Sequence, residues 1–191
     1  MPDTRERLEK LKQLCTRCTS CDLYKKRKHL VFGDGSETAK IIFIGEGPGA
    51  EEDQLGLPFV GRSGKLLRKL IAAIGLRPEQ YYIANIVKDR PPNNRPPTPE
   101  EIKSCFPILE KQIEIISPKL LVLLGKTAVT GIIPDQAETP MIILRNECKT
   151  KPIFFKNIPV FITYHPSAIL RQPSLKSPYL EDFNYLKKLV A

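Results

Sequence analysis

Four short apolar runs, each followed by small or polar residues, stand out along the chain. They cover residues 40–45, 82–87, 120–125 and 159–164. Runs of this length with turn-forming residues at their ends are typical of buried β-strands. Stretches with helical periodicity lie between them, so the pattern predicts strands that alternate with helices. Such alternation indicates a parallel sheet covered on both faces, and we expect an α/β fold.

Two of the intervening helices are well marked. The first is expected over residues 64–74 and the second over residues 100–116. The second has a strong start signal, because Thr98 can cap it and Glu101 completes a capping box. A proline-rich loop, residues 90–97, precedes this helix. Its restricted backbone predicts a fixed wall beside the sheet.

The residues that follow the predicted strands are the first candidates for chemistry, because ligands of open parallel sheets bind outside the carboxyl ends of the strands. The first strand runs into a glycine-rich, acidic turn over residues 45–53, the second carries Asn85, and the last ends at His165. A single asparagine or histidine is more often structural. Three polar groups at one edge favour a binding site, and the acidic turn argues against a phosphate cradle.

Composition narrows the class of protein. The chain has 191 residues, of which 41% are hydrophobic, enough for the core of one domain. Its net charge of +9 favours a polyanionic partner such as nucleic acid, or serves solubility alone. Because no run approaches the ~20 apolar residues of a membrane helix and no signal peptide is visible, we expect a cytoplasmic protein without membrane contact. Five cysteines there indicate metal binding or burial rather than disulfides.

Four blocks of sequence, taken in order, resemble the iron-sulfur uracil-DNA glycosylases of family 4. They comprise residues 18–23 with 31–35, 45–53 with 58–62, 85–88 with 90–92, and 165–168. The resemblance implies a three-layer α/β/α sandwich with a small, mainly four-stranded parallel sheet. It also implies a single domain over residues 1–191, with a cysteine-bearing N-terminal segment over residues 1–30. The expected activity is to flip uracil out of DNA and hydrolyse its N-glycosidic bond, which starts base excision repair, and we expect a monomer.

The resemblance also assigns roles in the pocket for the base. Phe59 would stack on the flipped base. Asn85 would donate to uracil O4 and accept from N3–H, and cytosine presents the opposite polarity at both positions. His165 would donate to O2, where negative charge builds as the bond breaks. Backbone amides around Glu46 and Gly47 would make the remaining contacts to the carbonyl oxygens.

The residue that positions the attacking water is left open. Other glycosylase families place an aspartate or asparagine where this chain has Gly47. Glu46 and Glu52 are therefore candidates for this catalytic role, beside His165. The alternative is that both acids only cap the segment that follows them.

Contacts with DNA are expected next to the catalytic histidine. The resemblance implies that Ser167, Leu170 and Arg171 contact DNA, with the segment around Leu170 entering the gap that the flipped base leaves. The basic run over residues 25–28 either adds phosphate contacts or forms a solvated turn.

Three cysteines match the ligands by which the family holds a [4Fe–4S] cluster, namely Cys18, Cys21 and Cys105. The place of the remaining family cysteine is taken by Asp89. Either the carboxylate of Asp89 or the thiolate of Cys15 completes the set, or the cluster is incomplete or absent; zinc is a further alternative. Because the proposed catalytic groups are not cysteines, we expect the cluster to have a structural role.

Two other functions compete with the glycosylase. One is a catalytically weak uracil-DNA or nucleic-acid binding protein on the same fold, against which the presence of Phe59, Asn85 and His165 together argues. The other is a metal-dependent nucleotide hydrolase that uses the acidic cluster of residues 51–53. Dependence of activity on magnesium would favour this hydrolase.

Overall fold

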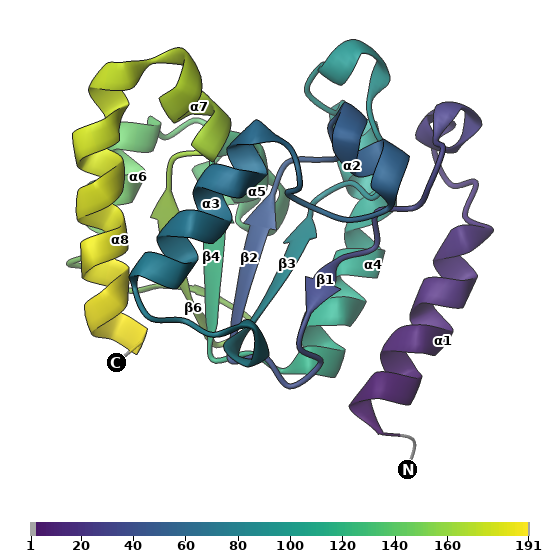
Figure 1. Ribbon diagram of the computed structural model, residues 1–191, viewed down its shortest axis with the longest axis horizontal. Helices are drawn as coiled ribbons and strands as arrows, with labels where there is room; N and C mark the ends of the chain where they lie inside the picture. The colour runs from purple at the N-terminus through teal and green to yellow at the C-terminus, as the bar shows by residue number, and fades with distance from the viewer. Residues whose placement is uncertain (1–2, 191) are drawn as a thin grey trace.

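A six-stranded mixed sheet forms the middle layer of the computed structural model, which describes residues 3–190 (Figure 1). The strands are Asp34–Gly35 (β1), Ile41–Gly45 (β2), Tyr81–Asn85 (β3), Leu120–Leu124 (β4), Ile153–Phe155 (β5) and Ile158–Thr163 (β6). Their order across the sheet is β1-β3-β2-β4-β6-β5. The strands β3, β2, β4 and β6 pair in parallel, whereas β1 and β5 pair antiparallel at the two edges. The predicted four-stranded parallel core is confirmed, and two short edge strands enlarge it.

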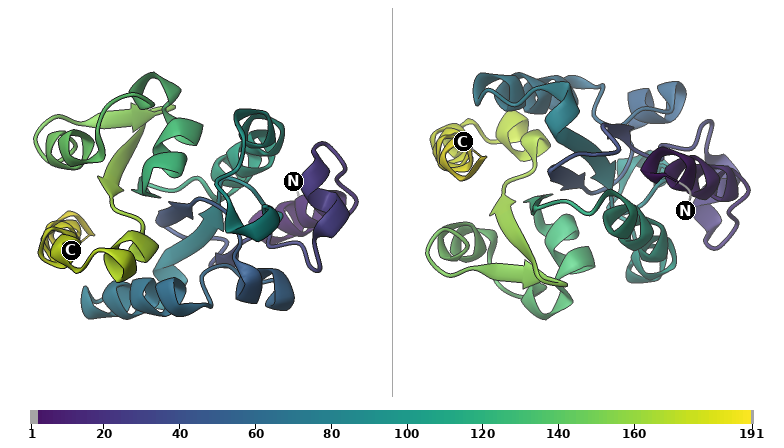
Figure 2. Two further views of the ribbon diagram at one scale, coloured as in Figure 1. Left: turned by 90° about the horizontal axis from the view of Figure 1, so that it is seen from above. Right: turned by 90° about the horizontal axis from the view of Figure 1, so that it is seen from below.

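Helices cover both faces of the sheet. Within residues 3–190 the α-helices are Thr4–Thr16 (α1), Ala50–Leu55 (α2), Arg62–Ala73 (α3), Pro99–Ile116 (α4), Lys126–Ile132 (α5), Met141–Glu147 (α6), Pro166–Arg171 (α7) and Lys176–Val190 (α8). Figure 2 shows α3, α7 and α8 on one face and α4, α5 and α6 on the other. The helix α1 packs against the outside of α4. This arrangement is the expected three-layer sandwich.

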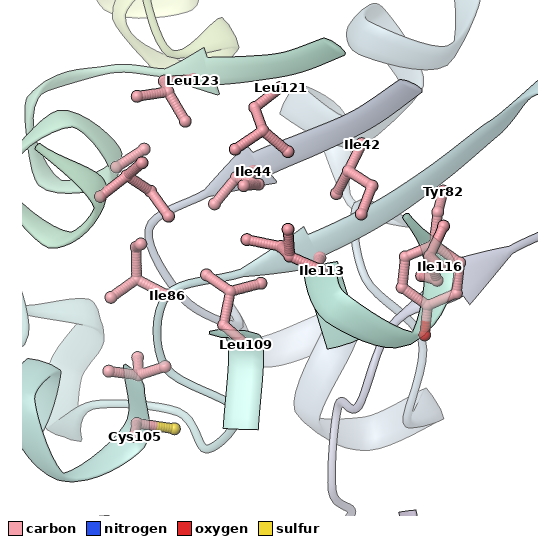
Figure 3. Close-up of a cluster of buried hydrophobic side chains, with 14 of the residues drawn as sticks. Ile42, Ile44, Tyr82, Ile86, Cys105, Leu109, Ile113, Ile116, Leu121 and Leu123 are labelled. Carbon is pink, nitrogen blue, oxygen red and sulfur yellow. The ribbon is translucent and has the colours of Figure 1, made fainter. Parts of the chain in front are cut away.

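The strands are apolar throughout because both of their faces are buried. Ile42 and Ile44 of β2 pack into the core on the α4 side, whereas Phe43, between them, packs into the core on the α3 and α8 side. In Figure 3, Leu109 and Ile113 of α4 lie against Ile42 and Ile44. A strand buried on both faces reads as a continuous apolar run, which explains why these strands could be recognised from sequence.

The helix α4 begins where its sequence signals predict. Thr98 Oγ1 accepts from the backbone N–H of Glu101 at 3.2 Å, and the Glu101 carboxylate accepts from the N–H of Thr98 at 2.8 Å. Arg95 donates two hydrogen bonds, of 2.7 and 2.8 Å, to the same carboxylate. The proline-rich loop is thereby tied to the start of α4, as expected of a fixed wall.

The helices within residues 3–190 have the length and the one-sided burial of helices that cover a sheet. The longest, α4, has 18 residues and carries buried residues on the side that faces the sheet. Among residues 3–190 no helix combines the length and the apolar character needed to cross a membrane.

Candidate active site

A pocket of about 250 Å³ opens at the carboxyl edge of the parallel strands. Its walls are Glu46, Gly47, Pro48, Gly49, Glu52, Phe59, Ser63, Asn85, Pro91, Asn94, Arg95, His165, Ser167 and Arg171. Every residue predicted to bind the base or to act in catalysis lines this one pocket. Its volume lies below the roughly 300–1,000 Å³ of sites for drug-sized ligands, so it suits a single base better than a whole nucleotide.

Asn85 lies in the pocket with a buried side-chain oxygen that accepts no hydrogen bond from the described residues. It ends β3, is paired in register with Gly45 of β2, and is 2% exposed. Within residues 3–190 no group donates to its side-chain oxygen Oδ1. A Cβ on Gly45 would stand 2.6 Å from that oxygen and 2.4 Å from Cζ of Phe59, so only glycine leaves room for both side chains. A buried unpaired acceptor costs about 1–3 kcal/mol, and a ligand with an N–H donor would relieve this cost.

Phe59 is held in a conformation that a phenylalanine rarely adopts. Its φ of 54° is in the left-handed region. The backbone of Phe59 lies against α3 so closely that a Cβ on Gly64 would approach its carbonyl carbon to 2.0 Å. Arg68 of the same helix donates to the Phe59 carbonyl oxygen at 3.1 Å. Strain of about 1–3 kcal/mol that is fixed in this way is typical of functional positions.

The Glu52 carboxylate secures the other side of this turn. It accepts hydrogen bonds from three backbone N–H groups, those of Gly49 at 3.1 Å, Val60 at 2.9 Å and Gly61 at 2.8 Å. Glu52 therefore caps α2 and fixes the two residues after Phe59. With its oxygens so engaged, the carboxylate is poorly placed to hold a water molecule as well.

His165 presents its ring to the pocket as a neutral hydrogen-bond donor. Its Nδ1 lies 3.2 Å from the backbone N–H of Ser167, which can only donate, so Nδ1 accepts. The ring proton then belongs on Nε2. Burial, together with the positive charge of Arg171, lowers the pKa of His165 to about 4, so the ring is uncharged at neutral pH. The ring centroids of His165 and Phe59 lie 5.7 Å apart.

Glu46 is oriented by a residue that the sequence did not indicate. Its carboxylate accepts from the hydroxyl of Thr127, which lies on α5. A signal was available, since Thr127 closely follows β4, whose carboxyl end belongs to the same edge of the sheet as Asn85. Arg68 was missed as well, because it acts through the Phe59 backbone from the middle of a helix.

The predicted DNA contacts occupy two different positions. Ser167 and Arg171 line the pocket, and the Ser167 hydroxyl lies 2.7 Å from Nδ1 of His165. Leu170 is 43% exposed on α7 and lies outside the pocket walls. All three stay predictions as DNA contacts. Ser63 also lines the pocket, and so do Pro91, Asn94 and Arg95 of the proline-rich loop, which had been expected to form a wall beside the sheet.

The basic run over residues 25–28 makes several contacts within the protein. Lys25 pairs with Asp22 at 2.8 Å. Arg27 pairs with Asp89 at 3.2 Å, and Lys28 donates to Gln54 at 2.8 Å. These contacts favour a structural turn over a surface dedicated to phosphates.

A second cavity, of only about 10 Å³, gathers the candidate ligands of the metal site. Cys15, Cys18, Cys21, Asp89 and Cys105 all line it. Burial raises the pKa of Cys15 to about 11 and that of Cys105 to about 12, so these thiols are protonated at neutral pH without a metal. In the described part of the chain, no three acidic, histidine or cysteine side chains are arranged to hold a single metal ion. A single zinc ion would need each thiolate sulfur at about 2.3 Å. Cysteine thiolates are the usual ligands of four-iron clusters, so the side chains gathered here match a cluster in their chemistry.

Three larger cavities lie elsewhere, and one of them, of about 580 Å³, is lined by exposed residues at the end of α1. Of the other two, one of about 470 Å³ lies at the amino edge of the sheet beside α8, and one of about 670 Å³ lies between α4 and α5. Both are lined mainly by apolar residues with lysines among them. Neither brings an unpartnered buried polar atom and a neutral histidine together, so the smaller pocket is the candidate active site.

Comparison with known proteins agrees with this geometry. Residues 32–187 match the family model described as the uracil DNA glycosylase superfamily. The chain belongs to this superfamily. A type-4 uracil-DNA glycosylase of Thermotoga maritima is 42% identical over 191 residues, which cover 98% of this chain and 97% of that protein. One of Archaeoglobus fulgidus is 42% identical over 174 residues, or 90% of this chain and 87% of that protein.

The resemblance to the family-4 enzymes is thus confirmed. A third type-4 uracil-DNA glycosylase, of Sulfurisphaera tokodaii, is 43% identical over 185 residues and covers 95% of this chain. A type-5 uracil-DNA glycosylase of Pyrobaculum aerophilum is more distant, at 27% identity over 150 residues. Membership of the superfamily agrees with the three-layer α/β/α fold.

Proposed function

We propose that this protein is a uracil-DNA glycosylase whose 250 Å³ pocket receives a uracil flipped out of DNA and hydrolyses its N-glycosidic bond, starting base excision repair. The observation that carries the proposal is the unpartnered Oδ1 of Asn85, buried beside Phe59 and a neutral His165. The names of the type-4 relatives support it.

Asn85 selects uracil by the direction of its hydrogen bonds. Its Oδ1 accepts from uracil N3–H, and its side-chain amide donates to O4. Cytosine has an acceptor at N3 and an amino donor at C4, so it would leave both groups of Asn85 unpaired. Sites built to pair with a polar group reject an analogue without it by about 10⁴-fold or more. Phe59 stacks on the face of the base.

His165 stabilises the leaving group. As the bond between C1′ and N1 breaks, its electron pair passes to uracil and negative charge builds on O2. The Nε2–H of His165 donates to that oxygen. A preorganised donor of this kind contributes roughly 3 kcal/mol to the stability of the transition state. Because the ring is held neutral by burial, it acts as a hydrogen-bond donor and keeps its proton.

Glu46 is the group we assign to the attacking water. Thr127 holds its carboxylate at the pocket wall, whereas the carboxylate of Glu52 is engaged by three backbone N–H groups. Glu46 accepts a hydrogen bond from water, the water oxygen bonds to C1′, and the carboxylate takes the released proton. The uracil anion takes up a proton from solvent as Glu46 returns its own, so the products are free uracil and a DNA strand with an abasic site.

The thiol cavity is assigned to a [4Fe–4S] cluster with Cys18, Cys21 and Cys105 among its ligands. The donor chemistry supports this, since cysteine thiolates are the usual ligands of such clusters. The cluster would cross-link the N-terminal segment to α4, and the hydrolysis itself requires no electron from it. We further assign the protein to the cytoplasm as a monomer.

The test is release of free uracil from a uracil-containing oligonucleotide in the presence of a chelator. We expect His165→Ala to slow release at least ~100-fold and Asn85→Ala to weaken discrimination against cytosine as well. His29→Ala and Asn146→Ala are matched controls outside the pocket and should release uracil like the native protein. A well-folded native protein that binds uracil-DNA without releasing uracil would be the binding protein instead, and a requirement for magnesium would favour the hydrolase.

A further inference from the structure

Asp89, which stands where the family has a cysteine, already has a partner. Both of its carboxylate oxygens lie near Nη1 of Arg27, at 3.2 and 3.4 Å. The two side chains are largely buried, with exposed fractions of 15% for Arg27 and 11% for Asp89. Arg27 is itself anchored at the end of α1 through the carbonyl oxygens of Cys15 and Thr16. A carboxylate that turned towards iron would leave this guanidinium buried and unpaired, which is strongly unfavourable.

Cys15 has the position that a ligand needs. It lies in the last turn of α1, is 3% exposed, and lines the same cavity as Cys18, Cys21 and Cys105. The chain turns back directly after the helix, because the N–H of Cys18 donates to the Cys15 carbonyl oxygen at 3.1 Å. Three cysteines at intervals of three residues thereby reach one wall of the cavity.

Cys105 and Lys88 also line the cavity, where Lys88 would stabilise thiolate sulfur. Figure 3 shows Cys105 at one end of the row of α4 side chains that face the sheet. Its Sγ accepts from the backbone N–H of Lys88 at 3.2 Å. The Lys88 side chain lines the cavity and is 1% exposed, and its ammonium makes one side-chain hydrogen bond within residues 3–190, to the Asn85 carbonyl oxygen at 2.9 Å. Thiolates in the cavity would provide the negative charge that this buried cation lacks.

We propose that Cys15 replaces the missing family cysteine, so that Cys15, Cys18, Cys21 and Cys105 hold the cluster and Asp89 serves as the counter-ion of Arg27. The inference rests on the cluster assigned under the proposed function. Cys15 and Cys105 lie on the helices α1 and α4, whereas Cys18 and Cys21 lie in the segment that follows α1.

The test is iron content and visible absorbance of the full chain purified without oxygen. We expect about four irons in the native protein. Cys15→Ala should lose most of this iron and the visible band, whereas Asp89→Asn should keep both. Cys148→Ala is the matched control, a free cysteine outside the cavity, and should also keep its iron. Retention of iron by Cys15→Ala, or its loss from Asp89→Asn, overturns the proposal.

A double variant separates ligation from misfolding. In Cys15→Ala combined with Asp89→Cys, a thiol returns at the family position, and iron should rise again towards the native content. A double variant that is as well folded as the native protein but as poor in iron as Cys15→Ala would mean that the loss came from damage at position 15, and the assignment would fall. Uracil release is measured on the same samples. Native protein that releases uracil without containing iron overturns this inference alone, and iron-loaded protein that releases none overturns the proposed function alone.

Discussion

At the scale of single residues, the pocket contains groups that would each be more stable in another setting. Asn85 has a buried oxygen without a donor, Phe59 has a positive φ, and His165 is half-buried and neutral. Arg68 and Glu52 hold the turn of Phe59 from its two sides. The surrounding structure therefore fixes a pocket that is complementary to a base before the base arrives, which reduces the ordering required on binding.

The neutral state of His165 has a consequence for pH. Because its pKa falls from 6.5 to about 4 on folding, the unfolded chain binds the proton first as the solution is acidified. This contribution to the free energy of unfolding is present above pH 6.5 and is lost between pH 6.5 and 4, on the order of 3 kcal/mol in total. Urea unfolding at pH 7.5 and 4.5 should show a smaller loss for His165→Asn than for the native protein. Equal losses in the two proteins would show that His165 titrates normally.

At the scale of elements, the sequence predicted those parts of the fold whose side chains are buried on both faces or capped by local signals. The four parallel strands and α4 belong to this class. The edge strands β1 and β5 do not, because β1 has two residues and β5 alternates between partly buried and exposed positions. The strand β1 pairs with β3, which is distant in sequence, whereas β5 forms a hairpin with the next strand, β6, through Lys156 and Asn157.

The packing of α3 against the turn of Phe59 leads to a prediction at Gly64. Alanine is favoured over glycine inside a helix by about 1 kcal/mol, so propensity alone would make Gly64→Ala stabilising. The Cβ would instead approach the Phe59 backbone to 2.0 Å, and we expect the contact to dominate. Uracil release should fall by at least about tenfold, since a small misplacement of a positioning group can have a large effect on rate.

Lys65→Ala, at an exposed position next to it on α3, is the control and should leave release unchanged. Native uracil release by Gly64→Ala, together with raised thermal stability, would mean that the turn of Phe59 can move freely away from α3.

At the scale of the whole molecule, the site is assembled from segments that lie far apart along the chain. The strand-end residues were predictable, because Asn85 and His165 follow apolar runs and parallel strands end at one edge. Thr127, the partner of Glu46, was missed although it closely follows a predicted strand, because the two residues are 81 positions apart and meet only after α5 has packed. The engagement of Glu52 depends likewise on the path of the turn after Phe59, which no local pattern reveals.

The excess of basic residues predicts how binding should respond to salt. Arg171 lines the pocket, whereas Lys187 lies in the last turn of α8, at the opposite end of the molecule (Figure 1). If Arg171 contacts a phosphate, Arg171→Ala should reduce the slope of log Kd against log salt by about 1. Lys187→Ala should leave the slope as in the native protein. Binding of uracil-DNA measured from 50 to 200 mM salt gives both slopes, and an unchanged slope for Arg171→Ala would remove this residue from the DNA contacts.

The ion pair between Arg27 and Asp89 also restricts how such a chain could have diverged from its relatives. Replacement of Asp89 by cysteine alone would leave the buried Arg27 without its counter-ion. Removal of Arg27 alone would leave the buried Asp89 carboxylate without its counter-ion. Each single step passes through a less stable ancestor, so the two positions are expected to change together over evolutionary time. Among homologous sequences, a cysteine at position 89 should therefore rarely occur with an arginine at position 27, and an alignment of many relatives would reveal this covariation.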